Sequence, residues 1–143
     1  MTRRYPGIFL LPIALTACSK GEKVPAYLEV GAVTLTTTPE QGASTSKITD
    51  AWISVDGTLI GVWELPARLP VLAEGDHTVT VAPAIKRNGM FDDRLRYPFY
   101  TSWSGSASLA REGTATVAPS VTYIEQTEFW IEDMQDPFSR FTV

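Results

Sequence analysis

Two residues could be centres of chemistry, because each is the only one of its kind in the chain: Cys18 and His77. A thiolate beside an imidazole can act as a nucleophile with its base, and both groups can ligate zinc. Each such site needs more ligands or an orienting partner, and no second cysteine or histidine is present. His77 follows a Gly-Asp turn in phase with Val79 and Val81, so we expect it to cap that turn or pack at the edge of a core. The sequence therefore predicts no zinc site and no cysteine–histidine nucleophile.

Carboxylates are the other candidates, and the chain has 16 of them. The neighbouring pairs Asp92-Asp93 and Glu132-Asp133 offer oxygen ligands of the kind calcium prefers, but neither has the Asp-x-Asp-x-Asp-Gly spacing of a calcium loop. Two opposed carboxylates could hydrolyse a glycoside, yet the sequence singles out no such pair. A glycine-rich phosphate loop and Gly-x-Ser-x-Gly are both absent from the sequence, and Trp103-Ser104-Gly105-Ser106 is more typical of a turn. We therefore predict that the protein is not an enzyme and uses no cofactor.

The context of Cys18 suggests a different role for it. The cysteine ends the run Leu15-Thr16-Ala17-Cys18, which follows Arg3-Arg4 and the apolar stretch 8–15. A basic start, a short apolar stretch and small residues before a cut are the features of a signal peptide. The stretch is much shorter than the roughly 20 apolar residues that a membrane-spanning helix needs. The alternative is a buried N-terminal strand that contains a cysteine by chance.

The run Leu15, Thr16, Ala17 and Cys18 resembles the lipobox of bacterial lipoproteins. That resemblance implies that residues 1–17 are a cleaved signal peptide and that Cys18 is acylated and becomes the mature N-terminus. Lipid chains would then hold the protein on a bilayer without spanning it. Ser19 directly after the cysteine is, by the same resemblance, typical of export to the outer membrane. We expect residues 18–26, which are small and charged and contain a proline, to form a tether in the cell envelope.

The charge of the remaining chain restricts its partners. Without residues 1–17, 10 Lys and Arg oppose 16 Asp and Glu, a formal charge of 10 − 16 = −6. Nucleic acids require a basic surface that neutralises phosphates, and adhesion to anionic lipid headgroups requires the same kind of surface. We therefore expect no nucleic-acid partner, and a contact with the lipid bilayer that is made by acyl chains rather than by charge.

From Tyr27 onward, apolar residues recur at every second position, which is the spacing of half-buried strands. Such runs occupy 77–81, 95–103 and 115–123. Pro98 places the second of these runs at a sheet edge or delays its start. No stretch has the period of an amphipathic helix. We expect an all-β fold over residues 27–123: a small antiparallel, immunoglobulin-like or PEGA-like β-sandwich of about seven strands.

Two irregular regions interrupt this pattern. Leu28 and Val30 have the opposite parity from Val33 and Leu35, which indicates a bulge at Gly31-Ala32. A second tight turn is expected at Asn88-Gly89. Around that turn we expect a solvated loop whose charges pair locally, namely Arg87, Asp92, Asp93, Arg94 and Arg96.

The clearest local prediction is a hairpin centred on Asp56-Gly57. Asp-Gly between β-rich runs favours a two-residue type I′ turn, whose central residues both need positive φ. That turn sets a register with the pairs Val55–Thr58, Ser54–Leu59, Ile53–Ile60, Trp52–Gly61 and Ala51–Val62. Because side chains alternate, one face then carries an aliphatic set that we assign to the core: Ala51, Ile53, Val55, Ile60 and Val62.

The opposite face of the predicted hairpin carries Trp52, Leu59 and Trp63, with Trp52 lying across the bare backbone of Gly61. Two neighbouring indoles could stack on a sugar, or could cover a protein interface, where Trp is enriched. They could equally be buried by the second sheet, and their exposure decides among these alternatives. Trp52 and Trp63 are therefore the candidate ligand-stacking residues, and a glycan or an envelope protein is the candidate partner.

The hairpin belongs to a longer pattern: a strand ending in Val55-Asp56-Gly57, a glycine on the return strand, the link Leu65-Pro66-Ala67, then Gly75-Asp76-His77 before another strand. Over residues 50–83 this pattern resembles PEGA-type surface domains, although Leu65-Pro66 stands where those domains often have Thr-Pro. As far as about residue 123 the chain is also similar to the N-terminal domain of uncharacterised lipoproteins of Bacteroidetes-type bacteria. The resemblance implies a small β-sandwich at the cell surface with no catalytic residues to carry over. We therefore expect a non-catalytic structural or accessory module of a membrane-anchored lipoprotein.

The last segment, residues 124–143, differs from the rest. It carries five acidic residues and no basic one between Ile124 and Asp136. Twenty residues are too few to form a domain. They either pack on the sandwich or begin a further domain of a longer architecture, and we favour the second of these.

Overall fold

The computed structural model describes residues 23–130, so the predicted signal peptide, Cys18, most of the predicted tether and the end of the acidic tail lie outside the described residues. Within them the fold is all-β and sandwich-like, as the alternation predicted. Ten strands and two short 3-10 helices are present there: β1 Ala26–Val30, β2 Thr34–Leu35, η1 Pro39–Gln41, β3 Asp50–Val55, β4 Thr58–Glu64, β5 Ala67–Val71, β6 Gly75–Lys86, η2 Arg87–Gly89, β7 Arg94–Arg96, β8 Trp103–Leu109, β9 Thr114–Val117 and β10 Ser120–Val121.

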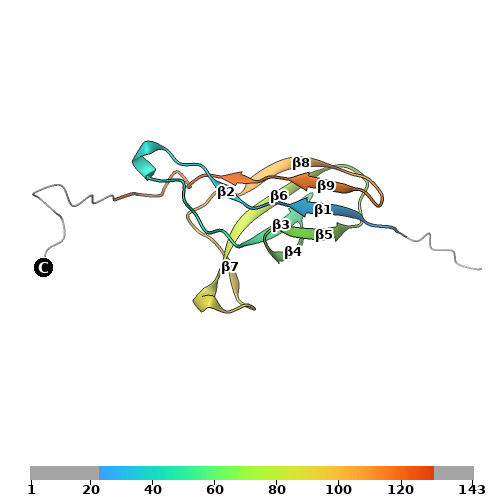
Figure 1. Ribbon diagram of the computed structural model, residues 1–143, viewed down its shortest axis with the longest axis horizontal. Coiled ribbons are helices and arrows are strands. Elements are labelled where there is room, and N and C mark those ends of the chain that lie inside the picture. The colour runs from blue at the N-terminus through green and yellow to red at the C-terminus, as the bar shows by residue number, and fades with distance from the viewer. Residues whose placement is uncertain (1–22, 131–143) are drawn as a thin grey trace, which may run out of the picture.

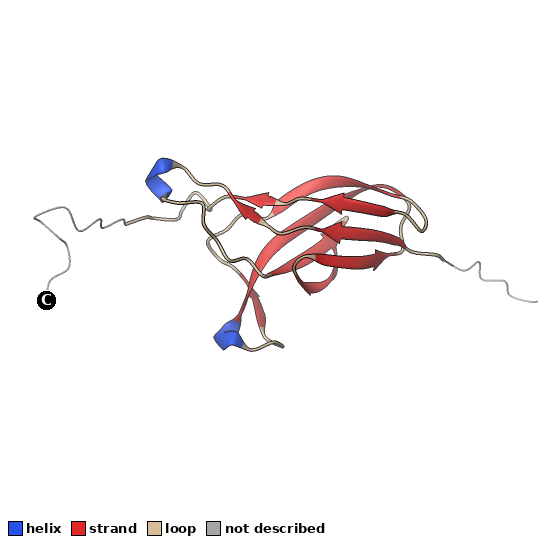
Figure 2. Ribbon diagram, viewed as in Figure 1, coloured by secondary structure: helices blue, strands red, loops and turns tan. Residues whose placement is uncertain are grey.

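Two layers of strands enclose the core (Figure 1, Figure 2). One layer has the order β4-β3-β6, with β7 and β8 both paired to β6, and the other contains β5-β1-β9 and the pair β10-β2. Each aliphatic side chain that is fully buried contributes roughly 1.5–3 kcal/mol. Both layers supply such side chains to a single cluster, among them Leu28, Val30, Leu69, Ile53, Val79 and Val81.

The bulge predicted near Gly31 is present. β1 pairs with β9 as far as Val30↔Val117, and β2 pairs with β10 from Thr34↔Ser120. Three residues separate the paired positions on the first strand and two on the last, so one residue is extra. This slip explains the change of phase in the apolar pattern. Both pairs are parallel, unlike the antiparallel pairs in the rest of the fold. Parallel neighbours cannot be joined by a tight turn, and here the paired strands come from opposite ends of the described chain, so none is needed.

The hairpin of β3 and β4 forms around the predicted turn. Asp56 and Gly57 have φ values of 48° and 76°, as a type I′ turn requires. The pairs next to the turn, Val55↔Thr58 and Ser54↔Leu59, also match the prediction.

Further from the turn the predicted register is wrong by one residue. The register shifts between Ile53 and Ser54, because Ile60 is an extra residue on β4. The pairs beyond that point are Ile53↔Gly61, Trp52↔Val62, Ala51↔Trp63 and Asp50↔Glu64. A shift of one residue reverses the face on which every later side chain lies. Ala51, Ile53 and Val55 are buried and Ile60 packs on the core as predicted, whereas Val62 lies on the other face.

The strand expected over 95–103 is interrupted. β7 ends at Arg96 and β8 begins at Trp103, and Pro98 lies between them without the N–H that a continuous ladder needs. Most of the strand expected over 95–103 is therefore absent, and the expectation of a turn at 103–106 is also wrong, since those residues start β8.

Candidate functional site

The two tryptophans predicted to share a face lie on opposite faces of their sheet. Trp63 pairs with the buried Ala51 and packs against the core, while Trp52 pairs with Val62 on the other side. Each indole Nε1 is buried without a hydrogen-bond partner in the described part of the chain. The predicted pair of neighbouring stacking rings is therefore absent, and the bulge at Ile60 is the physical reason.

The glycine of this hairpin is covered by Trp63, and not by Trp52 as predicted. A Cβ added at Gly61 would lie 2.9 Å from Trp63 Nε1, so the ring rests on the bare backbone. β8 repeats the arrangement, with the ring of Trp103 lying across Gly105. Both indoles close the edge of the core where the neighbouring residue has no side chain.

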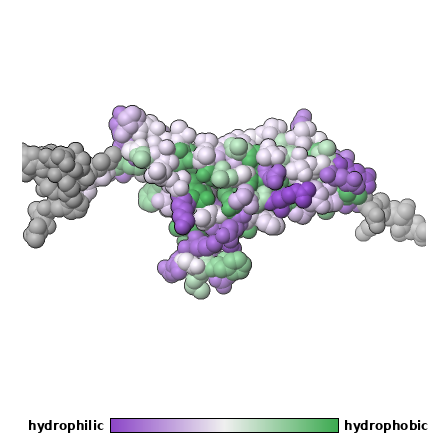
Figure 3. Space-filling model, viewed as in Figure 1, coloured by the Kyte–Doolittle hydropathy of each residue, from purple (hydrophilic) through white to green (hydrophobic). Residues whose placement is uncertain are grey.

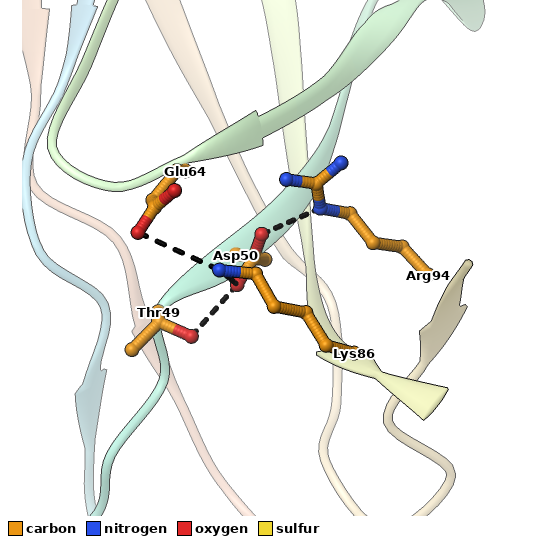
Figure 4. A network of polar contacts seen from close by, with 5 residues as sticks. All are labelled: Thr49, Asp50, Glu64, Lys86 and Arg94. Atoms are coloured by element: carbon orange, nitrogen blue, oxygen red, sulfur yellow. Dashed lines mark hydrogen bonds and ion pairs between the residues drawn. The ribbon is translucent and has the colours of Figure 1, made fainter. Parts of the chain in front are cut away.

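Asp50 is the buried charged residue of the described region, and it is the centre of a polar network (Figure 4). Thr49 Oγ1 donates to Asp50 Oδ2 at 2.7 Å, and Arg94 Nε donates to Oδ1 at 2.6 Å. Lys86 Nζ lies 3.7 Å from Asp50 Oδ2 and 3.5 Å from Glu64 Oε1. The network thus joins the start of β3 and the end of β4 to β6 and β7.

The charge state of Asp50 follows from these contacts. Burial by itself raises the pKa of the carboxyl, but the hydrogen bonds from Thr49 and Arg94 and the positive charges of Lys86 and Arg94 outweigh it, so the pKa is lowered overall. Both oxygens of the ionised group face donors. Such a carboxylate has little capacity to accept a proton, so the geometry favours a structural role over general acid–base catalysis.

The network holds the base of a projecting segment, residues 85–96, which we call the arm. The last residue of β6 that pairs with β3 is Ala84, and from Ile85 onward β6 pairs only with β7. Figure 1 shows η2 and β7 projecting away from the two layers. The prediction of local charge pairing here is confirmed for Arg87 and Asp93, but Arg94 bonds to Asp50.

His77 joins the β3–β4 turn to the start of β6. Its Nδ1 lies 2.6 Å from Asp56 Oδ2, and its Nε2 lies 3.1 Å from the Glu74 carbonyl oxygen. Both partners are acceptors, so the ring can donate to both only as the imidazolium. The hydrogen bond with Asp56 raises the pKa of His77, and it lowers the pKa of Asp56. His77 therefore caps the turn, as expected, and both of its ring nitrogens contact acceptors of the loop and turn rather than a nucleophile.

A cleft of about 210 Å³ lies beside the base of the arm and is lined by Lys47, Ile48, Pro83, Ala84, Ile85, Tyr97 and Tyr100. Ligand pockets usually have volumes of roughly 300–1,000 Å³. Burial raises the pKa of Tyr100 to about 12, and a hydrogen bond with Tyr123 adds to the effect, so the phenol stays protonated. The lining offers the amine of Lys47 and two tyrosine phenols, and no carboxylate.

Residues 23–130 contain no group of three or more His, Cys, Asp and Glu side chains placed to hold a metal ion. Over the same range, none of the helical segments has the length and apolar character needed to cross a membrane. Comparison of the chain with family models, curated proteins and solved structures finds no match.

Proposed function

We propose that this chain is a non-catalytic, lipid-anchored module of the bacterial cell envelope, held at the outer membrane through an acylated Cys18. The observation that carries the proposal is the order of Arg3-Arg4, an apolar stretch, Leu15-Thr16-Ala17 and then the only cysteine. That order supplies a basic start, a short apolar stretch and small residues before the cut. Acyl chains on Cys18 would hold the domain on the bilayer surface.

Two features of the described residues support the proposal. β1 begins at Ala26, eight positions after Cys18, so a short linker would place the folded domain close to the membrane. Asp50 and His77 contact partners that hold loops and strands together. That use of charge suits an accessory or structural module better than an enzyme.

The alternative of a carbohydrate- or protein-binding module lacks its geometric basis. It depends on Trp52 and Trp63 stacking together on one ligand, and these indoles lie on opposite faces of the sheet.

The test is the substitution Cys18→Ser in the full chain, expressed in a bacterium that processes lipoproteins. We expect the wild-type protein to enter the detergent-rich phase after phase separation, and Cys18→Ser to stay in the aqueous phase. Mass spectrometry of the wild-type protein should show residues 1–17 removed and acyl chains on residue 18. Ser19→Ala is the matched control, since it changes the neighbouring side chain and keeps the thiol.

Unchanged phase partitioning of Cys18→Ser would contradict the proposal. So would a wild-type mass that corresponds to the unmodified chain of 143 residues. Density-gradient separation of the two membranes tests the location, and we expect the wild-type protein with the outer membrane.

A further inference from the structure

The arm, residues 85–96, is an extension of one layer past the end of the other. The face of β6 that buries Val79 and Val81 continues onto Ile85, which pairs with Leu95. Ile85 and Leu95 nevertheless have 41% and 44% of their surfaces exposed, because no opposite strand covers that part of β6. The apolar face of the sandwich layer therefore continues onto the arm, where its side chains are exposed to solvent.

The tip of the arm is more exposed still. Met90 and Phe91 have 53% and 73% of their surfaces accessible. Four of the eight exposed large apolar residues in the described chain lie on this one arm: Ile85, Met90, Phe91 and Leu95. Figure 3 shows hydrophobic surface at the end of the projection, below a band of polar residues. Scattered exposed apolar residues are ordinary, but a group of them on one projection marks a contact site.

The charged groups on and around the arm largely cancel one another. The arm carries Lys86, Arg87, Arg94 and Arg96 against Asp92 and Asp93. Asp50 and Glu64 contact Lys86, and Asp50 also contacts Arg94, so the arm and the residues that it contacts carry four positive and four negative groups in total. The guanidinium of Arg94 also lies over the Phe91 ring, 4.9 Å from its centroid. The apolar tip, and not a net charge, is therefore the distinctive feature of the arm's surface.

The small area and projecting shape of the tip favour a lipid surface over a protein as its partner. A stable protein–protein interface needs about 20–30 residues from each side, whereas the arm offers four apolar side chains on a projection. A lipid–water interface accepts such a projection without a complementary surface, because acyl chains and headgroups rearrange around it. The lipid surface is thus the occupant that fits.

We propose that Met90 and Phe91 insert into the interfacial region of a lipid bilayer and fix the orientation of the domain on it. This proposal rests on the proposed function in one respect: the lipid anchor is what keeps the domain near a membrane. An anchor at one end leaves the domain free to rotate, and a weak second contact becomes effective at the high local concentration that anchoring provides. Because the base of the arm is close to neutral, the contact should persist on zwitterionic lipid and change little with salt.

The experiment supplies the anchor chemically, so that it does not depend on natural acylation. The full chain, produced without lipoprotein processing so that Cys18, its only cysteine, keeps a free thiol, is coupled through that thiol to a maleimide lipid in phosphatidylcholine nanodiscs. A spin-labelled lipid then broadens the amide resonances of residues close to the bilayer. We expect the strongest broadening at Met90 and Phe91, and loss of that broadening in the double variant Met90→Ser/Phe91→Ser. Phe91→Leu, which keeps an apolar side chain, should retain it.

Leu72→Ser is the matched control, since Leu72 is 66% exposed and lies between β5 and β6, away from the arm. It should leave the broadening at the arm unchanged. Uniform broadening over the domain, or broadening at the arm that survives the double variant, would overturn the proposal. Broadening of the arm that depends on protein concentration without lipid would identify a second copy as the occupant and would also overturn it. Failure of natural acylation affects none of these measurements, and resonances of the core report whether each variant is folded.

Discussion

The β3–β4 hairpin and the arm have similar apolar spacing and opposite surroundings. In the hairpin, Ile53 and Val55 alternate with outward residues and are buried against the second layer. In the arm, Ile85 continues the buried parity of β6 and remains 41% exposed. The difference lies in what faces the strand, since the second layer ends before the arm begins (Figure 1). Alternation thus reveals which side of a strand is apolar, and the extent of the opposite layer decides whether that side is covered.

The polar contacts of the two regions differ in burial and in what they hold in place. Near the hairpin turn, Asp56 contacts His77 at the surface and holds a loop whose apolar residues are already buried. At the base of the arm, the buried Asp50 bonds to Arg94 and so holds a segment that has little apolar packing of its own. We therefore expect the hairpin to depend mainly on burial and the arm mainly on a buried charge.

The largest expected effect comes from shortening an apolar side chain in the hairpin. Ile53 is completely buried, so Ile53→Ala should lower the free energy of unfolding by about 4 kcal/mol through lost burial and a cavity. Phe91→Ala on the arm should change it by about 0.5 kcal/mol or less, because the ring is mostly exposed. Denaturant unfolding of both variants measures the contrast. The slope of the unfolding free energy against denaturant concentration should be the same in both, so that a change in midpoint reports a change in stability. Equal losses in the two variants would contradict the distinction between the regions.

Asp50→Asn should have an intermediate effect. It leaves Arg94 and Lys86 facing a neutral amide, and removing one partner of a buried ion pair typically costs about 3–5 kcal/mol. Both cations retain some contact with solvent, so we expect a loss of about 2 kcal/mol. Hydrogen exchange should show that amides of β7 lose protection before those of β3.

Glu64→Gln is the matched control for that substitution. Glu64 contacts the same Lys86, but its side chain is 63% exposed, so we expect a change of about 0.5 kcal/mol or less. If Asp50→Asn is as mild as Glu64→Gln, the buried carboxylate is not what holds the arm.

Much of the fold could be predicted from local signals, and the error in the hairpin comes from one extra residue. The type I′ turn at Asp56-Gly57 follows from the φ preferences of two adjacent residues, and the parity change near Gly31 reveals a bulge. The extra residue at Ile60 carries no comparable signal, because Leu59-Ile60-Gly61 fits either register. The error of one residue at that point was sufficient to move Trp63 to the wrong face.

The candidate sites were less predictable than the strands, because their partners lie far apart in the chain. Asp50 and Arg94 are separated by 44 residues, and nothing in the sequence around either residue indicates the other. The exposure of Met90 and Phe91 depends on where the opposite layer ends, which is a property of the assembled sandwich. Lipidation of Cys18 is the reverse case, since its signal is contained within one short segment and remains a prediction from that segment alone.

The smallest expected effect concerns the pair His77–Asp56, and it appears as a dependence on pH. The pKa of His77 is raised from 6.5, so its stabilising contribution is complete below about pH 6.5 and is lost as the pH rises through the folded pKa. The pKa of Asp56 is lowered from 3.8, so its contribution is present above about pH 3.8 and is lost as the pH falls through the folded value. The pair should therefore add most stability between those two limits. Comparing wild type with His77→Gln, the difference in free energy of unfolding should shrink at higher pH.

Nuclear magnetic resonance provides a direct test, since His77 is the only histidine and its imidazole signals are unambiguous. Asp56→Asn should lower the pKa of His77 toward its ordinary value, because the amide offers a weaker acceptor and no negative charge. Asp92→Asn, which removes a carboxylate from the arm, should leave the pKa of His77 unchanged. If both variants shift the pKa equally, the general negative charge of the domain would be responsible. The contact at the turn would then have no specific effect, and the turn would be held, like the rest of the hairpin, by apolar burial alone.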